Sequence, residues 1–210
     1  RSSALASKAS GYPIARVSAK IAVGMTLDEI PLANTPASFE PALDYVVTKI
    51  ARFPFDKFNT VSNRLSTQMK ATGEVMSVGR TIEESLLKAV RSLEVGVNHI
   101  HSGKFDGYAQ SELEEYVREG RDDRLYALAE LIRRGTPLSD LYRLTKIDCL
   151  FLEKIKNITD LEQEVAAHPS DPAVLRKAKK AGFSDSFIAE LWKMPERALF
   201  DLRLREKIFP

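Results

Sequence analysis

Few side chains in this sequence have the types and spacing that catalysis or tight binding requires. Arg1, Ser2 and Ser3 place one guanidinium beside two hydroxyls, and a guanidinium can hold a carboxylate, carbonate or phosphate through two charge-assisted hydrogen bonds. On local grounds alone, a frayed terminus is the better interpretation of these residues. Glu74 follows Gly73 at the head of a predicted strand. If buried, it would be a carboxylate that needs a partner, and if exposed it would be only a strand end.

Patterns typical of metal sites and nucleophiles are weak. His99 and His101 lie two positions apart on a predicted loop with no Cys or carboxylate beside them, so we expect a solvated linker rather than a metal site. Cys149 lies in the apolar segment 147–152, which predicts a buried core thiol because no local His supports a nucleophile. His168 is expected at a helix end. Since no Walker-type loop or G-x-G-x-x-G is present, we expect no metal-binding and no cofactor-binding residue within this sequence.

A run of basic residues allows two interpretations. Arg176, Lys177, Lys179 and Lys180 cluster on one predicted helix, and the segment 173–191 has the form of a helix–turn–helix with Gly182 at its turn. A nucleic-acid patch is one interpretation. A solvated helix face is favoured, because the run contains no interleaved aromatic residue and many all-α domains share this shape. We therefore expect no nucleic-acid partner.

The composition excludes several classes of protein. Of 210 residues, 31 are Lys or Arg and 29 are Asp or Glu, giving a net charge of +2, which excludes a strongly basic nucleic-acid binder and an acidic tail. The 44% hydrophobic and 29% charged content is that of an ordinary soluble globular protein. One cysteine excludes an internal disulfide and fits a reducing compartment. No run reaches the roughly 18 apolar residues that span a bilayer. The chain opens at Arg1 with no apolar signal region, so we expect an internal piece of a longer polypeptide.

Residues 1–95 show mixed α and β signals. Apolar spacing predicts a helix from Ile14 to near Gly24, and β-branched residues predict strands over 44–50 and 74–79. Thr81 and Glu84 have the spacing of a capping box before a helix with an apolar stripe. Two or three strands are too few for an independent sheet. This part therefore resembles the end of an α/β domain.

Residues 96–210 have almost no strand signal. Helices over 111–119 and 122–134 each end at a glycine, and Thr136-Pro137, Ser170-Asp171-Pro172, Ser184 and Pro195 mark further helix starts. A longer helix is predicted over 147–167. Short connections between these helices indicate a compact all-α domain. The predicted fold class is α+β, with the C-terminal portion of an α/β domain followed by an all-α helical domain.

Several consecutive motifs resemble one family. They are RSSALASKASGYPIA at 1–15, PASFEP at 36–41, DYVVTKI at 44–50, GEVM at 73–76 and GRT at 79–81, with looser matches at 144–152, 180–185 and 208–210. In this order and spacing the chain resembles the large subunit of carbamoyl-phosphate synthase. The resemblance implies that residues 1–95 end the first ATP-grasp unit, which makes carboxyphosphate. It implies that residues 96–210 are the helical oligomerisation domain.

The resemblance also implies the reaction of the intact enzyme and its site residues. That enzyme makes carbamoyl phosphate from bicarbonate, glutamine-derived ammonia and two ATP, and unstable intermediates travel through internal passages. Arg1 matches a family arginine near the reaction centre, where it would hold bicarbonate or carboxyphosphate by preorganised charge. Ser2, Ala9 and Glu74 would line the ammonia or carbamate passages. The family's acidic metal ligands would lie outside this chain, which is expected to be inactive alone.

Cofactors and partners are implied in the same way. The intact enzyme would use ATP, Mg or Mn and potassium, none of them bound by this chain alone. Its partners would be a glutaminase small subunit and other large subunits, with homo-oligomeric contacts through apolar helix faces around Leu150, Phe151, Leu191 and Trp192, and no membrane. The location would be cytoplasmic, and the product would feed pyrimidine or arginine biosynthesis. The alternative is a stand-alone helical interaction module without catalysis.

Overall fold

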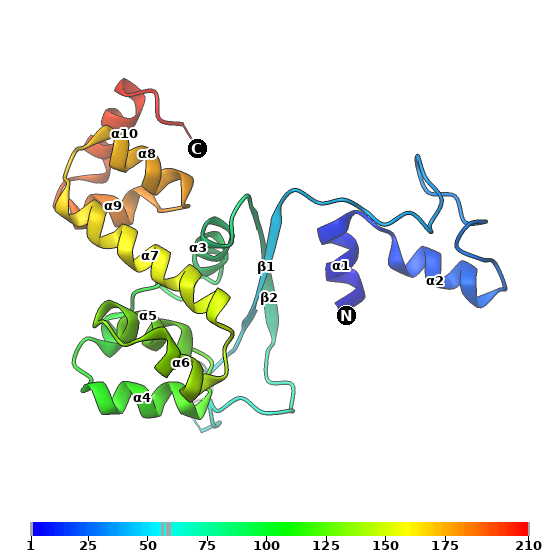
Figure 1. Ribbon diagram of the computed structural model, residues 1–210, viewed down its shortest axis with the longest axis horizontal. Coiled ribbons are helices and arrows are strands. Elements are labelled where there is room, and N and C mark those ends of the chain that lie inside the picture. Colours follow the sequence, from blue (N-terminus) through cyan, green and yellow to red (C-terminus); the bar gives the residue numbers. More distant parts are fainter. Residues whose placement is uncertain (1, 56, 58–59, 210) are drawn as a thin grey trace. The chain divides into compact units, whose positions relative to one another are not determined.

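The computed structural model describes residues 2–55, 57 and 60–209, and its elements are labelled in Figure 1. The chain forms two compact units, which divide between Tyr45 and Val46. Of the part of the chain that is described, no helix is long and apolar enough to cross a membrane. The fold class is α+β, with a small sheet and a mostly helical body, as the sequence predicts.

The first unit contains two short helices, α1 (Ser2–Ser10) and α2 (Ile14–Ala22). Its core is small and is formed by Val17, Ile30 and Ala37. The Tyr12 hydroxyl donates to the Ala37 carbonyl at 2.7 Å and so ties the start of α2 to the loop that follows it. The predicted helix from Ile14 is confirmed. The helix α1 was not predicted, because its small and polar residues carry little apolar periodicity.

The second unit begins with an antiparallel two-stranded sheet. Strand β1 (Val46–Arg52) pairs with β2 (Gly73–Gly79), and Val46 lies opposite Gly79. Helix α3 (Ile82–Ser92) packs on both strands. A Cβ on Gly79 would lie 2.8 Å from the Ser85 backbone nitrogen, so only glycine allows this close approach. Two strands are stabilised here because a helix covers one of their faces.

The predicted cap of α3 is present with a one-residue shift. The Thr81 hydroxyl accepts from the Glu84 backbone nitrogen at 3.2 Å, as in a capping box. The Glu84 carboxylate accepts from the backbone nitrogen of Arg80, at 2.7 Å, rather than from that of Thr81. Two backbone donors at the helix start are therefore satisfied by side chains.

The helical body surrounds one long helix. Its elements are η1 (Gly103–Phe105), α4 (Gln110–Glu119), α5 (Arg124–Arg133), α6 (Leu138–Thr145), α7 (Cys149–Ala167), α8 (Pro172–Lys180), α9 (Asp185–Leu191) and α10 (Glu196–Arg205). In Figure 1, α7 runs between the green helices α4, α5 and α6 and the orange and red helices α8, α9 and α10. It packs directly on α3, α5, α6, α8 and α9. Leu152, Ile155 and Ile158 of α7 are buried in a core that extends from Leu87 of α3 to Ile208. The prediction of successive helices with short connections is confirmed.

Cys149 and Trp192 differ from their predicted places. Cys149 is exposed, so the prediction of a buried core thiol is wrong. The reason is that α7 begins at this residue, where Asp148 caps the helix by accepting from the Leu150 nitrogen at 2.8 Å. The first three residues of the helix, 149–151, are exposed. Trp192 is buried rather than available for self-association, and its indole nitrogen donates to the Val165 carbonyl at 2.6 Å.

The predicted domain limits, 1–95 and 96–210, stay a prediction. Within the second unit, β1, β2 and α3 belong to the same compact body as the helices that follow. They belong together because Leu87 and Val90 of α3 are part of the apolar core of the helical part.

Candidate functional site

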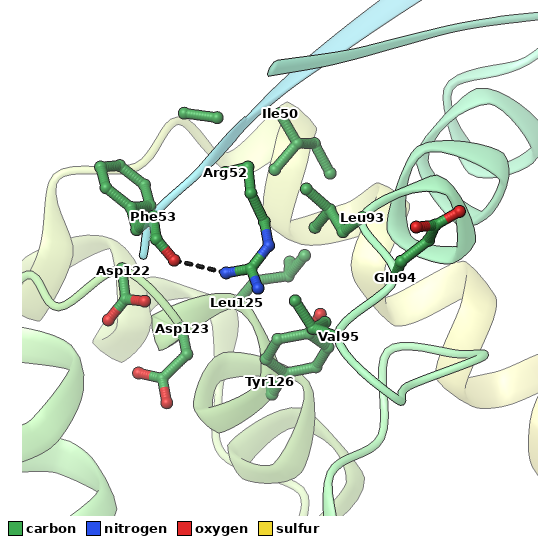
Figure 2. Close-up of a pocket in the computed structure, with 11 residues that line it drawn as sticks. Ile50, Arg52, Phe53, Leu93, Glu94, Val95, Asp122, Asp123, Leu125 and Tyr126 are labelled. Atoms are coloured by element: carbon green, nitrogen blue, oxygen red, sulfur yellow. Dashed lines mark hydrogen bonds between the residues drawn. The ribbon is translucent and has the colours of Figure 1, made fainter. Parts of the chain in front are cut away.

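One cavity of about 370 Å³ lies inside the second unit. It is formed by the end of β1, the segment that follows α3 and the start of α5 (Figure 2). Apolar side chains make much of its wall, among them Ile50, Leu93 and Val95. Concave cavities of this size with a few polar groups are the usual form of small-molecule sites.

The polar groups of this cavity are mostly acidic. Figure 2 shows Arg52 reaching into it from β1, with Asp122 and Asp123 on one side and Glu94 near the other. The Arg52 guanidinium donates to the carbonyl of Phe53. Three carboxylates and one guanidinium therefore line the cavity. None of the described lining residues carries a thiol or an imidazole, so the arrangement favours binding over nucleophilic catalysis.

The two aspartates of the cavity have different surroundings. Asp123 accepts from the Lys104 ammonium at 2.6 Å and from the Tyr116 hydroxyl at 2.6 Å, which fixes it in a structural network. Asp122 is half-buried, and that burial, followed by the charge of Asp123, raises the pKa of its carboxyl. A cation bound beside Asp122 would offset the cost of burying its charge.

The structure describes only some of the residues predicted to form a catalytic or passage-lining site. Arg1 lies outside the described residues, and Ser2 is described only as the first residue of α1. Ala9 is on α1, where its carbonyl accepts from the Tyr45 hydroxyl at 2.5 Å. Glu74 is on β2, is 48% exposed and forms an ion pair with Lys49 of β1. Of the two placements considered for Glu74, the exposed strand end is the observed one.

His99 is not a solvated linker residue, and that prediction is wrong. It is only 1% exposed, stacks on Phe187 with a centroid separation of 3.8 Å and meets the edge of Phe183 at 4.6 Å. Its Nε2 lies 3.5 Å from Oε2 of Glu162, and neither ring nitrogen forms a hydrogen bond with a described residue. Local sequence gave no signal for this contact, because Glu162 and Phe187 come from distant helices. The apolar neighbour Ile100, also buried, was the one available hint.

His101 has carboxylate neighbours that its sequence surroundings do not show. His101, Asp106 and Glu130 each place one donor atom within 4.8 Å of the others. Glu130 is already paired with Arg133 at 3.3 Å and with Arg134 at 2.7 Å. Two guanidiniums on the same carboxylate oppose the binding of a divalent cation there. The expectation that no metal ligand lies in the chain stays a prediction.

Two exposed apolar side chains lie at the start of α7. Leu150 is 49% exposed and Phe151 is 52% exposed, and we refer to them as the Leu150–Phe151 pair. Both were predicted to take part in contacts between copies of the chain. Single exposed apolar side chains are normal on protein surfaces, whereas contiguous ones mark contact sites, and these two residues are adjacent.

Two family models match the chain. The model described as "Carbamoyl-phosphate synthetase large chain, oligomerisation domain" matches residues 74–207, which is more than half of the chain. The model described as "Carbamoyl-phosphate synthase L chain, ATP binding domain" matches residues 1–30. The first match runs from β2 to the end of α10 and so covers the helical body.

Proposed function

The chain belongs to the carbamoyl-phosphate synthase large-chain family, as its motifs predict, and on that premise we propose that it is an internal assembly segment of a glutamine-hydrolysing enzyme. Its helical part would provide contacts between large chains, and it would catalyse no reaction alone. The single observation that carries this proposal is the match of the oligomerisation-domain model to residues 74–207.

The intact enzyme would activate bicarbonate with one ATP, add ammonia released from glutamine in a small subunit, and phosphorylate the carbamate with a second ATP. It would act in the cytoplasm. Carboxyphosphate and carbamate decompose in water, so exclusion of water along their path is a physical requirement. The role proposed for this chain in that chemistry is to form part of the walls and to hold large chains together.

ATP, Mg or Mn and potassium belong to the proposed enzyme rather than to this chain. The 370 Å³ cavity suits a triphosphate poorly, because its lining carries the three carboxylates of Glu94, Asp122 and Asp123 and the single guanidinium of Arg52. Carboxylates at short range repel phosphate oxygens. No step that uses ATP is therefore assigned to the described residues.

Assembly is tested by charge substitution of the Leu150–Phe151 pair in the intact large chain. Leu150→Glu with Phe151→Glu places two charges on a surface that would otherwise be buried between chains, and an unpaired buried charge strongly opposes association. We expect sedimentation velocity to show a shift toward smaller species. Met69→Glu, at a loop residue that is 82% exposed, is the matched control and should leave assembly unchanged. An unchanged distribution in the double variant would remove this pair from the proposed interface.

Arg1 is proposed to hold bicarbonate or carboxyphosphate in the intact enzyme, with Ser2, Ala9 and Glu74 beside the passages for ammonia or carbamate. Arg1→Ala should slow the first ATP-using step by roughly 10²-fold, as the loss of one preorganised donor typically does. The measurement is bicarbonate-dependent ATP hydrolysis without ammonia. Wild-type rates in Arg1→Ala would exclude this role.

A nucleic-acid-binding role is not favoured. In the helix–turn–helix shape formed by α8 and α9, the second helix carries Asp185 and Glu190, and its Phe187, Ile188 and Ala189 are buried in the core. A helix with acidic side chains and a buried face is poorly suited to a phosphate backbone.

A further inference from the structure

A second cavity, of about 540 Å³, lies between the start of α3, the C-terminal half of α8 and the residues after α10. Its lining includes Arg80, Glu84, Arg176, Lys180 and Phe209. We refer to it as the α3–α8 cavity. It contains most of the basic run that the sequence interpretation assigned to a solvated helix face.

Cations from two separate segments meet in the α3–α8 cavity. Arg80 precedes the cap of α3, and Arg176 and Lys180 are four residues apart on α8, on one face of that helix. Arg80 and Lys180 form no ion pair with any described residue. Arg176 donates to the carbonyl of Glu206 at 3.2 Å and likewise has no carboxylate partner among them. Three cationic groups thus line one concavity, and Glu84, whose pKa the charge of Arg80 helps to lower, is the carboxylate in its lining.

The carboxylate that lines this cavity already has hydrogen-bond donors. Its lining carboxylate, Glu84, accepts from the Lys88 ammonium at 2.5 Å and from the Arg80 backbone nitrogen at 2.7 Å. The remaining lining cation, Lys179, is bound to Asp185 at 2.7 Å. Burial, together with Arg203 and Arg91, lowers the pKa of the Lys179 ammonium although Asp185 opposes the shift. The local field is therefore positive and attracts anions.

We propose that the α3–α8 cavity binds a small phosphorylated molecule, with its phosphate held by Arg80, Arg176 and Lys180. Guanidinium groups match phosphate oxygens with two parallel hydrogen bonds, and an ammonium adds a point charge. Phe209 is 65% exposed at the wall of the cavity and offers an apolar surface for a ring or hydrocarbon attached to the phosphate. The volume is that of a small-molecule site rather than of an extended surface. The assembly role proposed for the chain does not require this site.

The test uses equilibrium binding of inorganic pyrophosphate and of phenyl phosphate to the 210-residue chain. We expect both to bind, and Arg176→Gln with Lys180→Gln to weaken both by at least roughly tenfold, since charge-assisted hydrogen bonds are lost. Phe209→Ala should weaken phenyl phosphate and leave pyrophosphate unchanged. Lys146→Gln with Lys193→Gln, which removes two exposed charges outside this cavity, is the control for net charge. Circular dichroism melting of each variant checks that it folds, which is expected because the substituted side chains are exposed.

Three results would overturn the proposal. One is pyrophosphate affinity that is equal in the wild type and the double variant. Another is tighter binding of triglutamate than of pyrophosphate, which would indicate an acidic protein segment as the occupant. The third is tighter binding of a short DNA duplex with a steep salt dependence, which would indicate a nucleic acid.

Discussion

His99 is a polar side chain buried between two phenylalanine rings. Its ring nitrogens lack hydrogen bonds with described residues, and the nearest carboxylate, Glu162, is held by the Arg133 guanidinium at 2.9 Å. Burial lowers the pKa of His99, and Glu162 only partly opposes this effect. A neutral imidazole stacks well on an aromatic ring, whereas an imidazolium at this place would lose its hydration. The neutral form is therefore the one that stabilises the fold.

Stability should consequently fall in mild acid. Because the pKa of His99 is lower in the folded chain than in the unfolded chain, the unfolded chain takes up a proton first as the pH drops. The contribution of neutral His99 to the free energy of unfolding is therefore fully present above about pH 6.5, and it declines below that pH. We expect His99→Phe, which keeps the stacking without the titration, to reduce the difference in urea stability between about pH 7.5 and about pH 5.5.

His168→Gln is the control for this measurement, because His168 is exposed at the end of α7. The pKa of Glu162 is lowered, so its carboxylate stays ionised over the same pH interval and does not contribute to the change. If His99→Phe loses as much stability in mild acid as the wild type, the assignment to His99 is wrong.

At the scale of elements, the turn between α8 and α9 fixes α3 to the helical body. Gly182 in this turn has a φ of +89°, and a Cβ there would lie 3.0 Å from Cα of Glu84 and 3.1 Å from its carbonyl oxygen. The Gly182 carbonyl accepts from the Arg91 guanidinium at 2.7 Å. The contact between α3 and this turn therefore depends on the missing side chain of Gly182 and on Arg91 of α3.

Gly182→Ala should be much more destabilising than the same change at Gly135. Gly135 has a φ of +84° but open space around its Cβ position, so the cost there is only that of the left-handed backbone, about 1 kcal/mol. At Gly182 the close backbone contact adds to this cost, and we expect a total loss of at least about 2 kcal/mol in urea unfolding. Equal losses at the two glycines would show that α3 can move away from the turn.

Helix ends could be predicted where a local capping residue marks them. Gly120, Asp171 and Ser184 marked helix ends or starts where the structure has them, because caps act through backbone groups only a few residues away. The burial of His99 and the convergence of Arg80 with α8 had no such signal. Both result from packing between residues far apart in the sequence, which periodicity and spacing do not encode.

At the scale of the whole molecule, the sequence indicated the family but not where the proposed site residues lie in the fold. Family motifs indicated the family to which the chain belongs, and the family models confirm it. The placement of Glu74 at an exposed strand end, paired with Lys49, depends on the β1–β2 register.

We propose that this chain assembles and supports a carbamoyl-phosphate synthase without performing its chemistry. The most direct measurement is ATP hydrolysis by the purified 210-residue chain with and without bicarbonate. We predict no bicarbonate-dependent turnover, because neither described cavity combines several phosphate-binding cations with a free carboxylate for the metal. The 370 Å³ cavity has a single guanidinium, and Glu84 of the α3–α8 cavity is already paired with Lys88. Bicarbonate-dependent hydrolysis that disappears in Asp122→Asn or Arg52→Gln, in chains that remain folded, would contradict the claim and place a catalytic site in the 370 Å³ cavity.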